Sequence, residues 1–128
     1  MLQKIENYHH AVAQLDQAVA VYSNDQSDSL YRDGLIQRFE FTVELAWKSL
    51  KEYLEDQGSV LAVAAPRAVL KDAYAAGVIM DAEIWDEIIR SRNVTSHVYD
   101  EQTAIEVADR VCSTYLPILQ KLDNFYRQ

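Results

Sequence analysis

The chain has 128 residues, 49% of them apolar, a size and composition that suit one globular domain with its own core. Twenty acidic residues against twelve basic ones give a net charge of −8. This charge argues against indiscriminate binding to nucleic acid, and we expect no DNA partner, because such affinity comes mostly from neutralising phosphates. An RNA substrate would have to bind at a local patch of basic residues, or at a composite surface made with another subunit.

The single cysteine cannot form an internal disulfide, so nothing requires an oxidising compartment. The first ten residues lack the apolar core of a signal peptide, and no run of about 18 apolar residues is present. We therefore expect a cytoplasmic protein without a membrane partner.

Only three glycines and two prolines interrupt the chain, which favours long helices over many short strands. Residues 2–22 predict a first helix, because apolar side chains recur at spacings of three and four. These residues are Ile5, Tyr8, Val12, Leu15, Val19 and Tyr22. A polar turn follows at 23–29, in which Asp28 or Ser29 can cap the next helix.

The second helix is expected to continue to about Gln57, with Gly58 ending it in a left-handed conformation. Its apolar seam consists of Ile36, Phe39, Val43, Ala46, Leu50 and Tyr53. The opposite side carries charged residues, among them Glu44 and Lys48 at the spacing of a helical ion pair. We interpret that side as a solvated face.

Residues 59–65 are apolar, but no partner strand is evident, so we interpret them as a packed connector. Pro66 predicts the start of a short helix through Ala76. Asp81 predicts the start of a helix whose buried stripe includes Trp85 and Ile88. The acids at this start, Asp81, Glu83, Asp86 and Glu87, need no metal, and no His or Cys stands at ligand spacing.

Asp100 can cap the last helix, and Pro117 should kink it. Its seam is Ala104, Ala108, Val111, Tyr115, Ile118, Leu122 and Phe125. Together the patterns predict an all-α fold, an up-down antiparallel four-helix bundle with one additional short helix, formed by a single domain over residues 1–128.

The segment 92–100, RNVTSHVYD, carries most of the chemistry in the chain. Arg92 and His97 lie five positions apart, about 140° around an unbroken helix, so the helix should fray near Asn93 for them to share a groove. Arginine binds phosphate oxygens, and histidine exchanges a proton near neutral pH. By residue chemistry alone this spacing is more typical of a pair that caps the helix and faces solvent than of a catalytic pair. Ser96 is expected to close the turn, and Asn93 could position a substrate or do the same.

The run at 32–54, RDGLIQRFEFTVELAWKSLKEYL, resembles the signature of the nucleotidyltransferase substrate-binding proteins, a branch of the HEPN superfamily. The pairs Pro66-Arg67 and Ala76-Gly77 and the stretch 85–100 resemble the same family. Within 92–99 the chain matches the family pattern Arg-x4-His-x-Tyr at Arg92, His97 and Tyr99.

The resemblance implies a homodimeric bundle that works with a small nucleotidyltransferase of the same operon as a toxin and antitoxin. In that reading the chain is a metal-independent endoribonuclease without a cofactor, and Arg92 and His97 are catalytic in a cleft at the dimer interface. Asn93 and Ser96 support them. The transferase would silence the enzyme by modifying Tyr99, whose hydroxyl should therefore be at the surface.

A second reading follows from the same resemblance. Some members of the branch are non-catalytic subunits that bind a nucleotide or substrate for the nucleotidyltransferase. In that case Arg92 would bind phosphate, and this chain would break no bond.

Overall fold

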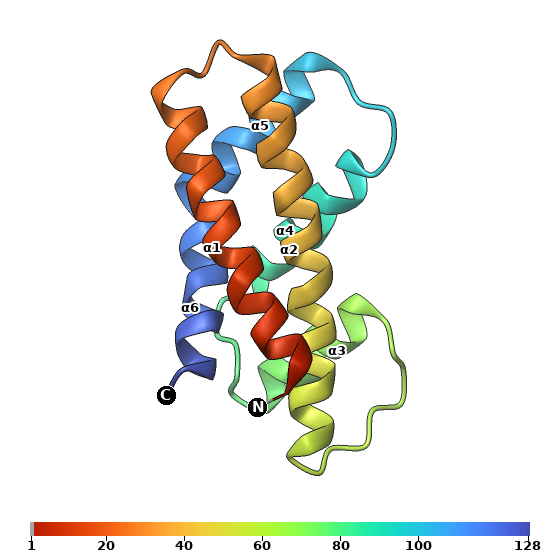
Figure 1. Ribbon diagram of the computed structural model, residues 1–128. Coiled ribbons are helices and arrows are strands. Elements are labelled where there is room, and N and C mark those ends of the chain that lie inside the picture. The colour runs from red at the N-terminus through yellow and green to blue at the C-terminus, as the bar shows by residue number, and fades with distance from the viewer. Residues whose placement is uncertain (1) are drawn as a thin grey trace.

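The computed structural model describes residues 2–128, and it contains helices and no strand over that range. The helices are α1 (Gln3–Asn24), α2 (Ser29–Asp56), α3 (Pro66–Ala75), α4 (Ala82–Thr95), α5 (Glu101–Arg110) and α6 (Leu116–Tyr126). A π-helical turn, η1 (Val111–Tyr115), joins α5 to α6 without a break, so these three segments form one bent helix. The chain is thus the predicted up-down bundle of four longer helices with α3 as the short extra one (Figure 1).

The helix boundaries follow from side-chain caps and left-handed glycines. Asp28 accepts hydrogen bonds from the backbone N–H groups of Leu30 (2.8 Å) and Tyr31 (3.1 Å), as predicted for the start of α2. Asp100 caps α5 in the same way through Thr103, at 2.8 Å. Gly58 and Gly77 have φ of +95° and +76°, conformations that glycine adopts without strain, and they follow the ends of α2 and α3.

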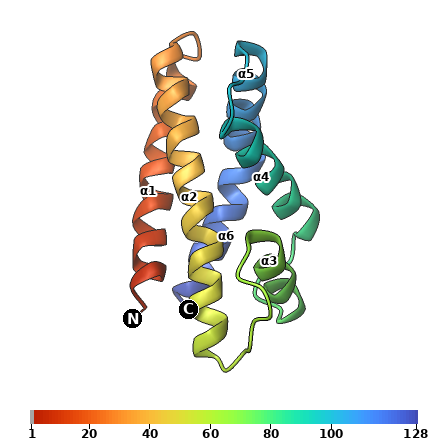
Figure 2. The ribbon, with the colours of Figure 1, turned by 90° about the vertical axis from the view of Figure 1, so that its right-hand side faces the viewer.

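The connector at 59–65 is not packed as predicted. Val60 and Val63 are exposed, and Leu61 is the apolar side chain of the connector that packs against the core. The reason is that α3, rather than the connector, fills the space beside α2 and α4. Its residues Val69, Leu70 and Ala73 are buried there. Figure 2 shows α3 beside α2, with the connector rising to it from the lower end of α2.

The core lies between the hairpin of α1 and α2 and the bent helix α5–η1–α6. Phe39 of α2 stacks on Tyr115, with ring centroids 5.5 Å apart. Tyr8 of α1 is fully buried, and its hydroxyl donates to the backbone carbonyl of Leu119 at 2.7 Å. Burying a phenol needs such a partner, because an unpaired polar group costs about 1–3 kcal/mol. This bond therefore fixes α1 against α6.

The π-helical turn explains how Pro117 is accommodated within a continuous helix. Proline has no N–H group, and its ring collides with the carbonyl four residues earlier in a regular helix. The turn inserts one extra residue just before Pro117, and the N–H group of Leu116 reaches the carbonyl of Val111 instead. The predicted disturbance is present, as a widened turn.

After the π-helical turn the buried position falls on Leu119 rather than on Ile118. Leu119 is fully buried, whereas Ile118, which the spacing placed on the seam, is half-buried. Leu122 is buried as predicted. The buried residues Tyr115, Leu119 and Leu122 still follow spacings of four and three, so the pattern alone did not distinguish position 118 from 119.

A polar network secures the π-helical turn to α4. Glu87 accepts hydrogen bonds from Arg110 Nε and from the Tyr115 hydroxyl, each at 2.6 Å, and the hydroxyls of Ser91 and Tyr115 are 2.7 Å apart. Arg110 precedes the turn and Tyr115 ends it. The hydrogen bond from Arg110, followed by that from Tyr115, lowers the pKa of Glu87 below its ordinary value.

Replacing Asp28 with alanine should destabilise the fold by about 1 kcal/mol, because two N–H groups at the start of α2 lose their acceptor. Urea denaturation followed by circular dichroism measures the loss. Asp25→Ala serves as the control, since Asp25 bonds only within the 25–28 turn and to the end of α1. Equal stabilities for the two variants would contradict the capping role.

The Glu87 network should make stability depend on pH. Because the folded-state pKa of Glu87 lies below its unfolded value of about 4.5, its bonds stabilise the fold above that pH and are lost as pH falls through the folded-state pKa. Glu87→Gln should therefore be less stable than the wild type near pH 7, and the gap should close towards pH 3. Urea midpoints across this range test it, with exposed Glu83→Gln as control. A difference in urea midpoint between Glu87→Gln and the wild type that stays constant with pH would contradict the stabilising role of the ionised Glu87.

Candidate functional site

The motif segment begins on the last turn of α4, which extends further than the sequence predicted. The helix continues to Thr95, two residues past the expected break near Asn93. The hydroxyls expected to weaken it instead bond to helix carbonyls: Thr95 to Arg92 at 3.2 Å, and Ser96 to Asn93 at 2.8 Å. Thr95 is also buried and donates to Glu40 of α2 at 3.0 Å. Tertiary contact thus overrides the weak helix propensity here.

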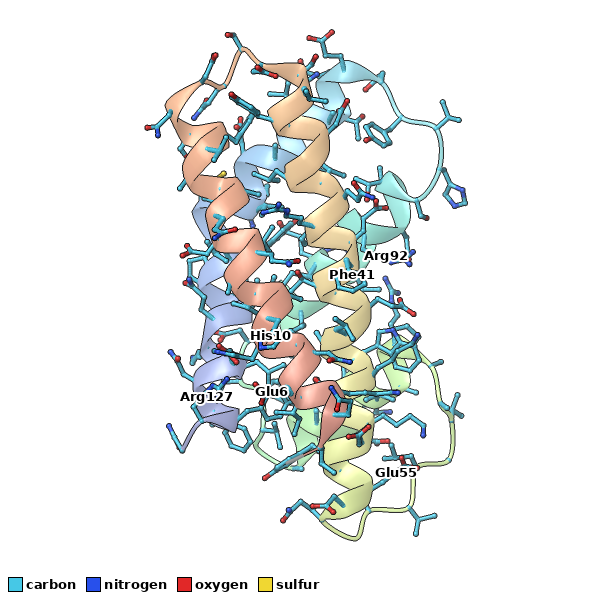
Figure 3. The ribbon with its side chains drawn as sticks, in the orientation of Figure 1. Glu6, His10, Phe41, Glu55, Arg92 and Arg127 are labelled. Carbon is cyan, nitrogen blue, oxygen red and sulfur yellow. The ribbon has the colours of Figure 1, made fainter. Side chains whose placement is uncertain are left out.

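Arg92 points from α4 towards α2, where it meets an acidic residue (Figure 3). Its Nη2 lies 3.5 Å from Glu44 Oε2, a long contact for a charged pair. About a third of the side chain is exposed, and its Nε is buried with no hydrogen-bond partner in residues 2–128. The guanidinium is therefore only loosely paired with Glu44, and its exposed part lies at the terminal nitrogens rather than at the buried Nε.

Glu44 also contacts Lys48 Nζ at 3.2 Å and the indole N–H of Trp47 at 3.3 Å. Burial acts to raise the pKa of Glu44, but the hydrogen bonds from Lys48 and Trp47 and the charges of Lys48 and Arg92 outweigh it, so the pKa is lowered. Glu44 is thus an anion at neutral pH, and it keeps the half-buried Arg92 from being an isolated charge.

His97 is exposed, and its side chain forms no hydrogen bond or ion pair with the other residues of 2–128. Its backbone N–H, rather than its ring, closes the helix end, bonding to the carbonyl of Val94 at 3.3 Å. No contact joins His97 to Arg92. Because α4 stays helical through Thr95, Arg92 is directed to α2 while the chain leaves the helix before His97. One copy of the chain therefore does not assemble the pair that the sequence suggested.

Tyr99 is half-buried rather than at the surface, and it packs against the edge of the core. Burial raises the pKa of its phenol, and the charges of Asp33 and Glu40 raise it further, against a smaller opposing effect of Arg32. The loop that carries Tyr99 is thus folded against the first half of α2. Tyr115 is buried, as predicted for a seam residue.

Two acids of α2 belong to this site, and sequence analysis had placed Glu44 on a solvated face. Glu40 and Glu44 are one helical turn apart and bind Thr95 and Arg92, which are three residues apart on α4. The four-residue spacing of Glu44 and Lys48 was visible in the sequence, but it explains only their own ion pair. Which helix faces these acids depends on packing.

In the described residues no group of three or more His, Cys, Asp or Glu side chains could hold a metal ion. No helix within 2–128 is long and apolar enough to cross a membrane. The chemistry available at the end of α4 is consequently that of a guanidinium, an imidazole, a phenol and two nearby carboxylates.

Comparisons with known proteins agree on one family. Residues 3–128 match the family model described as nucleotidyltransferase substrate binding protein like. A Haemophilus influenzae protein named probable ribonuclease HepT is 32% identical over 104 residues. The match covers 73% of this chain and 71% of that protein.

Solved structures share the fold. A Haemophilus influenzae protein described as a substrate binding domain of a nucleotidyltransferase superposes with a TM-score of 0.80 at 26% identity, covering 97% of this chain and 99% of that one. A Thermus thermophilus protein gives 0.73 at 28% identity, covering 89% and 99%. With the family pattern at Arg92, His97 and Tyr99, these matches show that the chain belongs to the nucleotidyltransferase substrate-binding protein family of the HEPN superfamily.

Proposed function

We propose that this chain is the ribonuclease subunit of a two-component system, a cytoplasmic homodimer that cleaves RNA without a metal and is silenced by a partner nucleotidyltransferase. One observation carries the proposal. The guanidinium of Arg92 is directed towards α2 with about a third of its side chain exposed, yet its only polar contact in the described chain, with Glu44, is 3.5 Å long. A charge held in this way suits an anionic ligand better than a structural ion pair.

Arg92 would bind the non-bridging oxygens of the scissile phosphate and stabilise the charge that builds up on them in the transition state. His97, exposed at the end of α4, would take the proton from the ribose 2′-hydroxyl. The 2′-oxygen then attacks phosphorus and the bond to the 5′-oxygen breaks. The products are a 2′,3′-cyclic phosphate and a 5′-hydroxyl, whose proton comes from an imidazolium or water.

The two groups do not meet within one chain, so the proposed site needs a second copy. His97 has no partner of its own in the described residues, and Arg92 is directed from α4 towards Glu44 of α2. In a two-fold dimer each imidazole could serve the guanidinium of the other subunit. In such a dimer the two Arg92 guanidiniums would lie near each other. RNA would approach the surface at that point, despite the net charge of −8 on each chain.

Regulation would act through Tyr99. A nucleotidyltransferase would join the α-phosphorus of a nucleoside triphosphate to the Tyr99 oxygen and release pyrophosphate. Its half-buried phenol has a raised pKa and is protonated at neutral pH, so the transferase would have to supply the base that removes the proton. The nucleotide added to Tyr99 would lie two residues along the chain from His97 and would obstruct the proposed RNA site.

The second candidate is a subunit that binds a nucleotide or substrate for the transferase and breaks no bond. Two observations favour it: Glu44 already neutralises Arg92, and no base faces Arg92 within the chain. The description of a related structure as a substrate binding domain of a nucleotidyltransferase agrees with it.

The purified chain, free of its partner, should cleave single-stranded RNA in the presence of EDTA. Arg92→Ala and His97→Ala should each lower the rate about 100-fold or more, the usual loss for a group that stabilises charge or transfers a proton. Gel analysis of labelled RNA measures this, and Arg90→Ala, an exposed arginine on the same helix, is the matched control. RNA left intact at high protein concentration would favour the binding subunit.

Mixing the two inactive variants tests whether the site is shared between subunits. If the guanidinium and imidazole come from different copies, half of the dimers in an equimolar mixture are mixed and each holds one intact site, so about a quarter of the activity should return. Two tags and sequential purification confirm that mixed dimers have formed. Mixed dimers without activity would place both groups of each site on one chain.

Incubation with the partner nucleotidyltransferase and ATP should attach a nucleotide monophosphate to Tyr99 and abolish RNA cleavage. Peptide mass spectrometry locates the adduct. Tyr99→Phe should stay unmodified and active, because only the acceptor oxygen is lost, while the exposed Tyr74→Phe serves as control. Adducts on another residue, with Tyr99 unmodified, would remove the regulatory part of the proposal.

A further inference from the structure

The start of α2 contains a buried arginine that the proposed function does not use. Arg32 is the fourth residue of this helix and is 7% exposed, and it is the one buried arginine within residues 2–128. Its backbone N–H bonds to the carbonyl of Asp28 at 3.2 Å, but its Nε is buried without a hydrogen-bond partner. The guanidinium forms no side-chain hydrogen bond or ion pair with the described part of the chain.

The other arginines of the chain are all paired. Each is more exposed than Arg32, and each has a hydrogen-bond or ion-pair partner; they are Arg38, Arg67, Arg90, Arg92, Arg110 and Arg127. A buried charge without a counter-ion is costly, and an arginine cannot give up its proton to avoid that cost. The least accessible guanidinium is thus the one without a partner, which suits a group that binds an anion from outside the chain.

The acids near Arg32 on α2 do not serve as its counter-ion. Asp28 caps the first turn of the helix, and Glu40 accepts a hydrogen bond from Thr95 at 3.0 Å. Asp33 is exposed, and adjacent residues of a helix do not face each other. The first turn also carries the positive end of the helix dipole, which disfavours a cation. An arginine at this position therefore gains little from the fold itself.

The loop at 96–100 brings Tyr99 towards this arginine. Tyr99 is half-buried and packs against the core, and the Asp100 cap fixes the far end of the loop to α5. In Figures 1 and 2 the starts of α2 and α5 lie at the same end of the bundle. Burial raises the pKa of the Tyr99 phenol, and the charge of Arg32 opposes that rise, so the two groups are close enough for their charges to interact.

We propose that Arg32 is a binding site for the phosphate group of a nucleotide, and that this nucleotide is the one joined to Tyr99. The second statement rests on the proposed function. A nucleotide joined through its phosphorus to the tyrosine oxygen is a phosphodiester, with one negative charge shared by two non-bridging oxygens. The guanidinium fork matches two such oxygens, and the anion neutralises the buried cation. The modified loop is then held against the start of α2.

The first test is stability in a buffer free of phosphate. Arg32→Met removes the charge and keeps an apolar chain of similar length, so its urea midpoint should equal or exceed that of the wild type. Arg38→Met is the matched control: it changes the net charge equally, but it should lower the midpoint, because Arg38 loses its 2.7 Å bond to the carbonyl of Gln14. An equal or greater loss in Arg32→Met would overturn the inference, because the guanidinium would then be part of the fold.

The second test uses AMP as the probe for the phosphate. Titration calorimetry in EDTA should show AMP binding to the wild type and to Arg38→Met, and about 10-fold or more weaker binding to Arg32→Met, the loss expected for charged hydrogen bonds. Arg32→Lys should recover part of the affinity, because it keeps the charge without the fork. Adenosine, which lacks the phosphate, should not bind.

Two outcomes of this titration would overturn the inference. One is a wild type that does not bind AMP. The other is AMP binding that is lost in Arg92→Met and kept in Arg32→Met, because the phosphate would then belong to the motif arginine.

The third test asks whether the bound phosphate is the one on Tyr99. After transfer from ATP by the nucleotidyltransferase, a phosphodiesterase should release AMP from Tyr99 about 10-fold or more faster in Arg32→Met than in the wild type or Arg38→Met, because the phosphodiester is no longer held. Circular dichroism confirms that each variant is folded.

The results of the third test separate this inference from the proposed function. Equal release rates would contradict the link between Arg32 and Tyr99, and weaker binding of 2′-O-methyl RNA to Arg32→Met would then assign the arginine to an RNA strand. If Tyr99 carries no adduct while AMP binding is lost in Arg32→Met, the regulation by Tyr99 is refuted and the phosphate site at Arg32 stands.

Discussion

The candidate site depends on two carboxylates of α2 that hold the last turn of α4. Glu40 accepts from Thr95 and Glu44 pairs with Arg92, so acids one turn apart on α2 bind residues nearly one turn apart on α4. Without these contacts the β-branched and hydroxyl residues after Arg92 have little reason to stay helical. The ordered turn directs the guanidinium to α2 and leaves His97 outside the helix. The geometry of the whole motif therefore follows from the packing of α4 on α2.

The same arrangement explains why one copy of the chain does not bring Arg92 and His97 together as the proposed ribonuclease site requires. A proton acceptor must lie within hydrogen-bond reach of its substrate, with the phosphate-binding group beside it. Here the imidazole has no side-chain partner in the described residues, and the guanidinium is paired only loosely with Glu44 and not with His97. The net charge of −8 adds a second constraint on the proposed function, because an RNA substrate would have to approach where cations are concentrated.

The widened turn before Pro117 shows how a local defect is used in this bundle. Proline would break a regular helix, yet the π-helical turn keeps α5 and α6 continuous and places Tyr115 where its hydroxyl reaches Glu87 and Ser91. After the turn Leu119 rather than Ile118 is buried, and Leu122 keeps its predicted place in the core. α4 is thus held on one side by the carboxylates of α2 and on the other by this network.

Local chemistry in the sequence was sufficient for the all-α class, the helix order, the caps at Asp28 and Asp100 and the stops at Gly58 and Gly77, since each depends on neighbours along the chain. The motif residues were recognisable because Arg92, His97 and Tyr99 match the family pattern, and not from their residue chemistry alone. Contacts between distant residues were decided only by the tertiary structure: the pairing of Arg92 with Glu44, the burial of Tyr99 and the exposure of Val60. Periodicity tells which face of a helix is buried, but not which helix covers it.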